Sequence, residues 1–292
     1  MGFKDFIALA RVRQWSKNLA VFAGLVFAVK LANPRSVLEA LLAFASFCLV
    51  SSAVYAVNDV VDAERDRQHP VKCDRPIPSG RIGVPTALIF AGALAVAGLG
   101  LAALLGAGFS ATVLGFAAIH LAYTFWLKHV AIVDMLVIAI GFVLRAVGGA
   151  VAISVPVSPW LVLCAGLLAL FLAAAKRRHE IVLLRERSEG HRPVLAEYSA
   201  ELLDSFMVTL SAATITSYAL YTFFEPRSPG HAMMLTIPFV IYGVLRYQYL
   251  VLHRGAGGRP EDVLLGDMPI RIDIVCWIAS AIVALYVLPR VL

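Results

Sequence analysis

Charged residues are scarce in this chain, and their scarcity excludes an ordinary soluble domain. Only 15% of its 292 residues are Asp, Glu, Lys or Arg, whereas 60% are hydrophobic. A soluble domain would have roughly a quarter of its residues charged. The hydrophobic residues also come in runs of roughly 20, the length that crosses a bilayer as an α-helix. The chain is therefore predicted to be an integral membrane protein.

Signals that would divide or cross-link the chain are also missing. The four cysteines, Cys48, Cys73, Cys164 and Cys276, have neither metal-binding nor redox spacing. No low-complexity segment or long linker occurs. Residues 1–292 are therefore predicted to form a single transmembrane domain.

The hydrophobic runs predict an all-α fold with nine transmembrane helices. The first run lacks a clear small-residue cleavage site, so it is interpreted as a retained helix and not as a secretory signal. The predicted spans are residues 15–32, 36–57, 84–105, 109–127, 131–153, 159–175, 203–224, 233–252 and 272–291.

Lys and Arg are distributed unequally between the two sides of the predicted membrane. With the N-terminus inside, 20 of the 25 fall in inner segments and 4 in outer segments, and Arg145 lies within a span. This asymmetry follows the positive-inside rule and predicts an outer C-terminus. The net charge of +6 is explained by this topology and by attraction to anionic head groups, so it does not indicate nucleic-acid binding.

Acidic residues gather on the same predicted side, although the positive-inside rule does not require it. Of 19 acidic residues, five lie between Asp59 and Asp74, six between Glu180 and Asp204, and four between Glu261 and Asp273. The inner face is therefore predicted to carry the polar, functional groups.

The first acidic cluster has helical spacing. Asn58, Asp62 and Asp66 recur every four residues, and Asp59 lies three and seven residues from the last two. On a helix leaving the second span these side chains share one face. Such carboxylates repel each other unless a cation lies between them, and oxygen-only ligands favour Mg²⁺, which usually adds substrate phosphate oxygens. The cluster predicts a magnesium–diphosphate site; the alternative is a solvated helix end with ordinary surface acids.

Several cations are candidates for binding the phosphate oxygens. Lys72 and Arg75 lie in a proline-rich loop that could fold over the metal site, or they simply supply positive-inside charge. Lys17 begins the first span, and Lys128 follows Tyr123 at the inner end of the fourth.

Arg145 lies within the fifth predicted span, about three helical turns from Asp134, so both could share a helix face. An arginine at bilayer depth costs on the order of 3 kcal/mol and normally faces the bundle interior with a partner. The alternative to substrate binding is a structural polar contact between helices.

The run Asn-Asp-x-x-Asp-x-x-x-Asp, placed after a second span, resembles the UbiA-type intramembrane prenyltransferase superfamily. The resemblance covers nearly the whole chain, including Arg75-Pro76 and the pair Tyr123 and Lys128. It implies helices around a central cavity with a lateral opening to lipid. It also implies that Asn58, Asp62 and Asp66 hold Mg²⁺ and that Asp59 assists.

One departure from that superfamily points to a narrower family. Typical aromatic prenyltransferases carry a second Asp-rich motif after span six, where this chain has Lys-Arg-Arg-His-Glu at 176–180. Together with residues 13–18 and 66–70, this pattern is similar to the decaprenyl-phosphate phosphoribosyltransferases. The resemblance implies transfer of 5-phosphoribosyl from phosphoribosyl diphosphate to a polyprenyl phosphate lipid, in the bacterial inner membrane, with the active site facing the cytoplasm. The product would be an arabinan precursor for cell wall biogenesis.

Charge balance agrees with a sugar-phosphate donor, because several phosphate groups need more cations than one magnesium ion supplies. The expected catalytic residues are Asp59, Asp62 and Asp66. The expected substrate-binding residues are Lys17, Lys72, Arg75, Tyr123, Lys128, Arg145, Lys176, Arg177 and Glu180. The acceptor phosphate is already an anion and needs no strong base, so positioning and electrostatics would carry the catalysis.

Two other functions stay open at this point. The chain could instead be a prenyltransferase that moves a prenyl group from a prenyl diphosphate to an aromatic acceptor. Charged residues within spans are also found in secondary transporters, but here no inverted repeat is seen and the acids lie at one rim. The sequence leaves open the polyprenyl chain length, the pathway and whether the chain forms a homo-oligomer.

Overall fold

A computed structural model describes residues 2–68, 71–185, 193–225, 229–258 and 260–291. These residues are largely helical, and no strand occurs among them, which confirms the all-α fold class. The chain divides into two compact units, Met1–Val157 and Ser158–Leu292, which are described separately. That both units form one catalytic domain stays a prediction.

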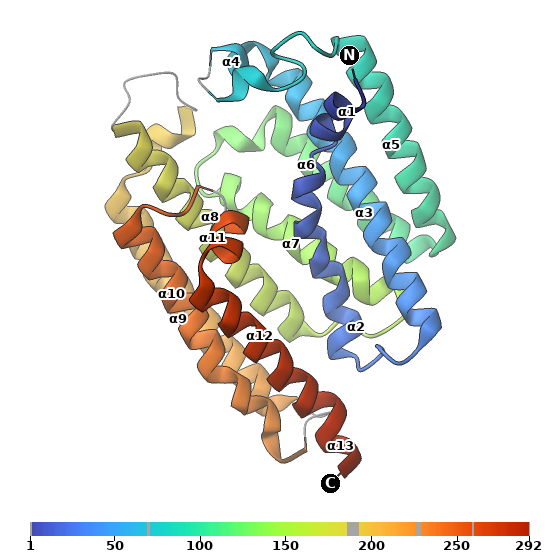
Figure 1. Ribbon diagram of the computed structural model, residues 1–292, viewed down its shortest axis with the longest axis vertical. Coiled ribbons are helices and arrows are strands. Elements are labelled where there is room, and N and C mark those ends of the chain that lie inside the picture. Colours follow the sequence, from blue (N-terminus) through green and yellow to red (C-terminus); the bar gives the residue numbers. More distant parts are fainter. Residues whose placement is uncertain (1, 69–70, 186–192, 226–228, 259, 292) are drawn as a thin grey trace. The chain divides into compact units, whose positions relative to one another are not determined.

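The first unit contains four long helices and several short ones (Figure 1). The long helices are α3 (Pro34–Val61), α5 (Val84–Leu104), α6 (Ala107–Phe125) and α7 (Val133–Ala152). The short elements are α1 (Phe3–Leu9), the 3-10 helix η1 (Val12–Phe22), α2 (Ala23–Phe27), α4 (Ala63–Arg67) and the 3-10 turns η2 (Lys72–Asp74) and η3 (Leu127–His129). The start of α3 is fixed by Asn33, whose side chain accepts the first backbone N–H groups, and by Pro34 in the first turn.

The segment formed by η1 and α2 runs antiparallel to α3. Successive contacts join the two in reverse order, namely Arg11 to Asp59, Trp15 to Ser52, Asn18 to Cys48 and Phe22 to Phe44. From Phe44 to Asp59, a separation of fifteen residues, α3 rises about 22 Å. Residues 11–22 cover the same length at about 2 Å per residue, the rise of a 3-10 helix. With α2 added, this short segment is about as long as a bilayer is thick.

The described residues contain eight long membrane-spanning helices and not the nine that were predicted. Eight helices there are long and apolar enough to cross a membrane, and the first of them is α3. The predicted span at 15–32 is built from η1 and α2, which replace one regular helix by a stretched one. Figure 1 places α2 at the end of the first unit opposite to α1 and α4, as a crossing requires.

A glycine on α7 allows η1 to lie this close to its neighbours. A Cβ atom at Gly149 would lie 1.8 Å from the backbone oxygen of Val21. At Gly24 a Cβ atom would lie 2.9 Å from the backbone of Ala150. Small residues at such positions let two backbones approach directly, as is common between membrane helices. The η1–α2 segment is therefore held by close packing on α7 and α3.

The second unit packs α8 (Pro159–Arg185), α9 (Ala200–Phe224), α10 (Ile237–Arg254) and α12 (Met268–Ile282) against one another. Its shorter elements are η4 (Pro193–Glu197), η5 (Pro229–Thr236), α11 (Pro260–Gly266), the π-helical turn η6 (Val283–Val287) and α13 (Leu288–Val291). Buried polar contacts tie these helices together. The hydroxyl of Tyr218 lies 2.6 Å from the hydroxyl of Thr236, and the indole N–H of Trp277 donates to Tyr218 at 2.8 Å.

Candidate active site

The acidic motif lies where α3 ends. Asn58 and Asp59 are in its last turn, Asp62 is its C-terminal cap, and Asp66 follows in α4. Backbone bonds from Asp62 to Asn58 and from Asp66 to Asp62 continue the helical spacing across the junction. Asp59 and Asp66 are buried, so their carboxylates need partners close by.

Arg75 joins two of these carboxylates. Its Nη1 atom lies 3.1 Å from Asp59 and 2.5 Å from Asp66, while Arg11 also pairs with Asp59. Lys72 lies 3.9 Å from the other oxygen of Asp66. Lys72 and Arg75 therefore do fold over the acidic motif. Burial lowers the pKa of the Arg75 guanidinium, and the nearby positive charge of Arg11 lowers it further.

The loop that carries Arg75 is anchored to the core. Ile77 and Ile82 are buried with Leu9 of α1 and Ala56 of α3. The three prolines of this loop, Pro70, Pro76 and Pro78, predict an extended backbone. The structure differs, because η2 and the turns after it fold the loop back on itself. His69 and Pro70 of the sequence motif lie outside the described residues.

A second set of contacts surrounds Asp62. The Nζ atom of Lys128 lies 2.7 Å from Asp62 Oδ1, and the Lys128 side chain is 3% exposed. Asn58 Nδ2 donates to Asp62 Oδ2 at 3.1 Å, and Thr124 Oγ1 donates to Asn58 Oδ1 at 3.3 Å. Tyr123 precedes Thr124 in the last turn of α6. The packing of α6 on α3 thus brings Lys128 to the acidic motif.

Arg145 lies deeper, away from these carboxylates. Its Nε atom donates to Asn18 Oδ1 at 2.6 Å and its Nη1 atom to the Gly141 carbonyl at 2.9 Å. The guanidinium also lies over the Phe116 ring, 4.5 Å from its centroid. These contacts form the polar link between helices that the sequence left open as an alternative, and the partner is Asn18 on η1. Lys17 is the neighbour of Asn18 and is half-buried.

In the second unit, the predicted cationic cluster lies on a helix. The last turns of α8 carry it, because no Gly or Pro interrupts residues 176–185 and ion pairs form between successive turns. Arg177 lies 2.5 Å from Glu180, and Lys176 lies 4.0 Å from it. Arg178 bonds to Asp204 of α9. Glu186 and Arg187, farther along the same cluster, lie outside the described residues.

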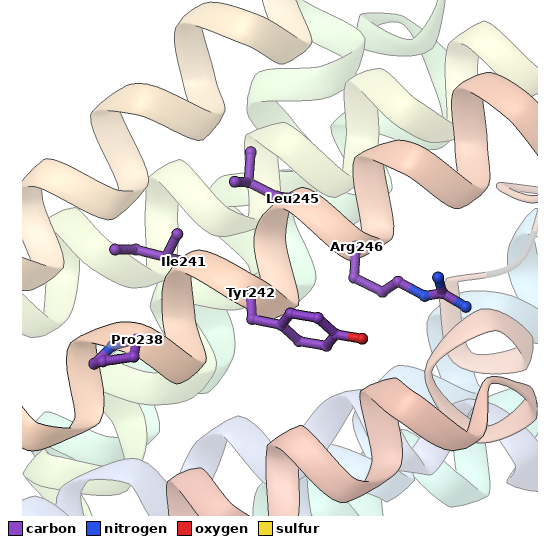
Figure 2. A pocket seen from close by; sticks show the side chains of 5 residues that line it. All are labelled: Pro238, Ile241, Tyr242, Leu245 and Arg246. Carbon is purple, nitrogen blue, oxygen red and sulfur yellow. The ribbon is translucent and has the colours of Figure 1, made fainter.

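A groove of about 490 Å³ follows α10 in the second unit (Figure 2). Pro238, Ile241 and Leu245 are its apolar residues. Figure 2 shows Tyr242 and Arg246 extending together, away from Ile241 and Leu245. Arg246 pairs with Asp267 at 2.9 Å. Sequence reasoning assigned no role to Tyr242 or Arg246, because single residues on one helix face give no motif.

The oxygen atoms around Asn58 and Asp62 suit magnesium. No group of three or more His, Cys, Asp or Glu side chains in the described part of the chain is arranged to hold a metal ion. Mg²⁺ does not need such a group, since it usually takes one or two carboxylates and completes its shell with water and substrate phosphate. The donor set of amide and carboxylate oxygens therefore fits Mg²⁺ together with a diphosphate.

A family model, related sequences and a solved structure all match this chain over most of its length. The model of the UbiA prenyltransferase family matches residues 18–254. The chain is 35% identical to a decaprenyl-phosphate phosphoribosyltransferase of Corynebacterium glutamicum, over 97% of this chain and 87% of that protein. It is likewise 35% identical to one of Mycolicibacterium smegmatis, over 96% and 92%. A UbiA homolog from Archaeoglobus fulgidus bound to DMAPP and Mg²⁺ has the same fold, with a TM-score of 0.74 at 20% identity over 97% of this chain and 99% of that one.

Proposed function

This chain belongs to the UbiA prenyltransferase family and is a multi-span membrane enzyme, and we propose that it transfers 5-phosphoribosyl from phosphoribosyl diphosphate to a polyprenyl phosphate. The observation that carries this proposal is the 35% identity to decaprenyl-phosphate phosphoribosyltransferases along nearly the full length of both chains. The cations around the acidic motif support it, because the donor and acceptor together bring several phosphate groups.

The residues at the end of α3 would prepare the donor for reaction. Asn58, Asp62 and Asp66 would hold Mg²⁺, which when bound neutralises charge on the diphosphate leaving group. Lys72, Arg75 and Lys128 would bind the diphosphate oxygens as the bond from C1 to the leaving oxygen breaks. Asp59 would hold Arg11 and Arg75 in place for this role, since it contacts both.

An oxygen of the acceptor phosphate would form the new bond to C1 of the ribosyl group. That oxygen is already negatively charged, so no side chain has to remove a proton, and the ribosyl group passes through an oxocarbenium-like state. Lys17, Tyr123, Lys176, Arg177 and Glu180 are proposed to bind the substrates. The polyprenyl tail would lie on apolar helix surfaces, such as the groove along α10 (Figure 2).

The site is proposed to face the cytoplasm from a bacterial inner membrane. This assignment rests on the excess of Lys and Arg in the segments on the same predicted side as the acidic motif. Phosphoribosyl diphosphate is water-soluble, so a site on the cytoplasmic side would have direct access to it.

A donor test separates this function from aromatic prenyl transfer. Purified protein in detergent should move radiolabel from phosphoribosyl diphosphate to decaprenyl phosphate and release diphosphate when Mg²⁺ is present. It should form no product from a prenyl diphosphate and 4-hydroxybenzoate. Aromatic prenylation without phosphoribosyl transfer would contradict the proposal and leave the chain a prenyltransferase in activity as well as in family.

A further inference from the structure

Each carboxylate of the acidic motif already holds a cation from the chain itself. Lys128 contacts Asp62, Arg75 contacts Asp59 and Asp66, Arg11 contacts Asp59, and Lys72 lies near Asp66. The carboxylate oxygens that would face a metal ion are thus the same oxygens that hold Lys128 and Arg75. A metal ion and these side chains compete for the same positions.

Charge makes this competition unequal. Four cations lie against three carboxylates, which leaves one net positive charge among these seven side chains. The carboxylates and Lys128 are buried or nearly buried, whereas Arg11, Lys72 and Arg75 are partly exposed. A divalent cation bound alone would add two more positive charges and would displace Lys128 and Arg75 from their partners. Displaced charges in a poorly hydrated site are costly unless an anion receives them. A magnesium–diphosphate complex is itself an anion and would receive them.

We propose that Lys128 and Arg75 are exchangeable counter-ions: they rest on Asp62 and Asp66, and they move to the diphosphate when the metal enters. Metal and diphosphate then bind as one unit, and neither binds well alone. The inference rests on the proposed function only for its substrate class, a diphosphate. It adds that the chain disfavours a metal-loaded state without substrate.

Lys128 is the better test of this exchange. Arg75 bridges two carboxylates, so it would keep Asp59 when it leaves Asp66. Lys128 contacts Asp62 at 2.7 Å and is almost fully buried, so its whole charge would transfer from carboxylate to phosphate. Removing that charge should therefore change the affinities for the metal ion and for diphosphate in opposite directions.

The experiment measures two affinities of the full-length protein in detergent. Mn²⁺ binding without diphosphate is followed by electron paramagnetic resonance, and binding of radiolabelled inorganic diphosphate is followed at saturating Mg²⁺. Lys128→Met should tighten Mn²⁺ binding about tenfold, because Asp62 loses its competing cation. The same variant should weaken diphosphate binding about tenfold, because a phosphate partner is missing.

Two further variants control this result. Lys128→Arg keeps the charge and should behave nearly as the wild type. Arg35→Gln removes one cation that pairs with Glu39 at the start of α3, the end of the helix far from the acidic motif, and should change either affinity less than twofold. If Lys128→Met does not fold, as judged from its melting curve, Arg75→Gln provides the same pair of measurements at Asp66.

A folded Lys128→Met or Arg75→Gln protein with unchanged or weaker Mn²⁺ binding would overturn the exchange. Loss of both affinities together would indicate a merely structural ion pair and would also overturn it. Neither measurement uses phosphoribosyl diphosphate or lipid. Coupled binding without phosphoribosyl transfer would therefore refute the proposed function alone, and transfer without coupled binding would refute the exchange alone.

Discussion

The buried ion pairs at the end of α3 are not a source of stability in themselves. Taking charges such as those of Asp62 and Lys128 out of water costs about as much as their attraction returns. Apolar residues of similar size would serve the fold as well. Three buried or nearly buried carboxylates next to one another are therefore better explained by the chemistry of the site than by packing.

The substitution Asp62→Asn tests this directly. The amide keeps the size of the side chain but removes the charge that holds Lys128 and would hold Mg²⁺. Turnover should fall at least roughly 100-fold. The melting temperature should fall as well, because the buried Lys128 side chain loses its carboxylate partner, but the protein should still fold. Glu64→Gln is the matched control, because Glu64 belongs to the same motif but its side chain is 84% exposed. Equal turnover in the two variants would remove Asp62 from the site.

At the residue scale, the sequence predicted the acidic motif but only part of its surroundings. Asn58, Asp62 and Asp66 could be found because their spacing is local and helical. Lys128 was expected near the site from its position at the end of a span. Thr124 and Arg11 were not assigned, since their contacts depend on how α6 and η1 pack against α3.

At the scale of elements, hydropathy predicted where helices lie better than how they are wound. Eight predicted spans appear as long helices, because each is a continuous apolar run. The stretched form of η1 could not be predicted, since it depends on the contact between Gly149 and Val21 across the fold. The length of α8 was also underestimated, because charged residues were taken to end the helix when they only end its apolar part.

The contact at Gly149 predicts a sharp difference between two glycine substitutions. Gly149→Ala would force the backbone of η1 or α7 to move, because the new Cβ atom would overlap the Val21 carbonyl. We expect it to destabilise the protein by about 1–3 kcal/mol or more, seen as a lower melting temperature in detergent.

Gly115→Ala on α6 is the control for this prediction, because nothing lies within 4 Å of its added Cβ atom. There alanine should be neutral or stabilising by up to about 1 kcal/mol, as in other helices. Equal melting temperatures for the two variants would contradict the close packing of η1 on α7.

At the scale of the whole molecule, the membrane topology depends on whether the η1–α2 segment crosses the bilayer. If it does, the N-terminus and the loop around Val71 lie on one side, and Lys30 lies on the other. Single cysteines at Gly2, Val71, Lys30 and Arg254, in a protein without its four native cysteines, can be labelled from either side of sealed vesicles. Only Lys30→Cys should react from the outer side.

Labelling of Gly2→Cys and Val71→Cys from opposite sides would show that the segment does not cross. It would also contradict the prediction that the N-terminus and the loop around Val71 face the same compartment.

The membrane topology could be predicted from the sequence alone, because Lys and Arg are distributed unequally between the two sides. The division into two compact units could not be predicted, because no linker marks the boundary at residue 157.

The polar character of η1 has a consequence for how the protein enters the membrane during its synthesis. This segment contains Arg13, Gln14, Lys17 and Asn18 in its first half. These polar residues make it a weaker independent span for the translocon than α3, whose residues are mostly apolar. Its Asn18 finds its partners, Cys48, Ser51 and Arg145, only after α3 and α7 have been made. The η1 segment, although synthesised before α3 and α7, would thus settle in the bilayer after them, and the orientation of the chain would be decided by α3.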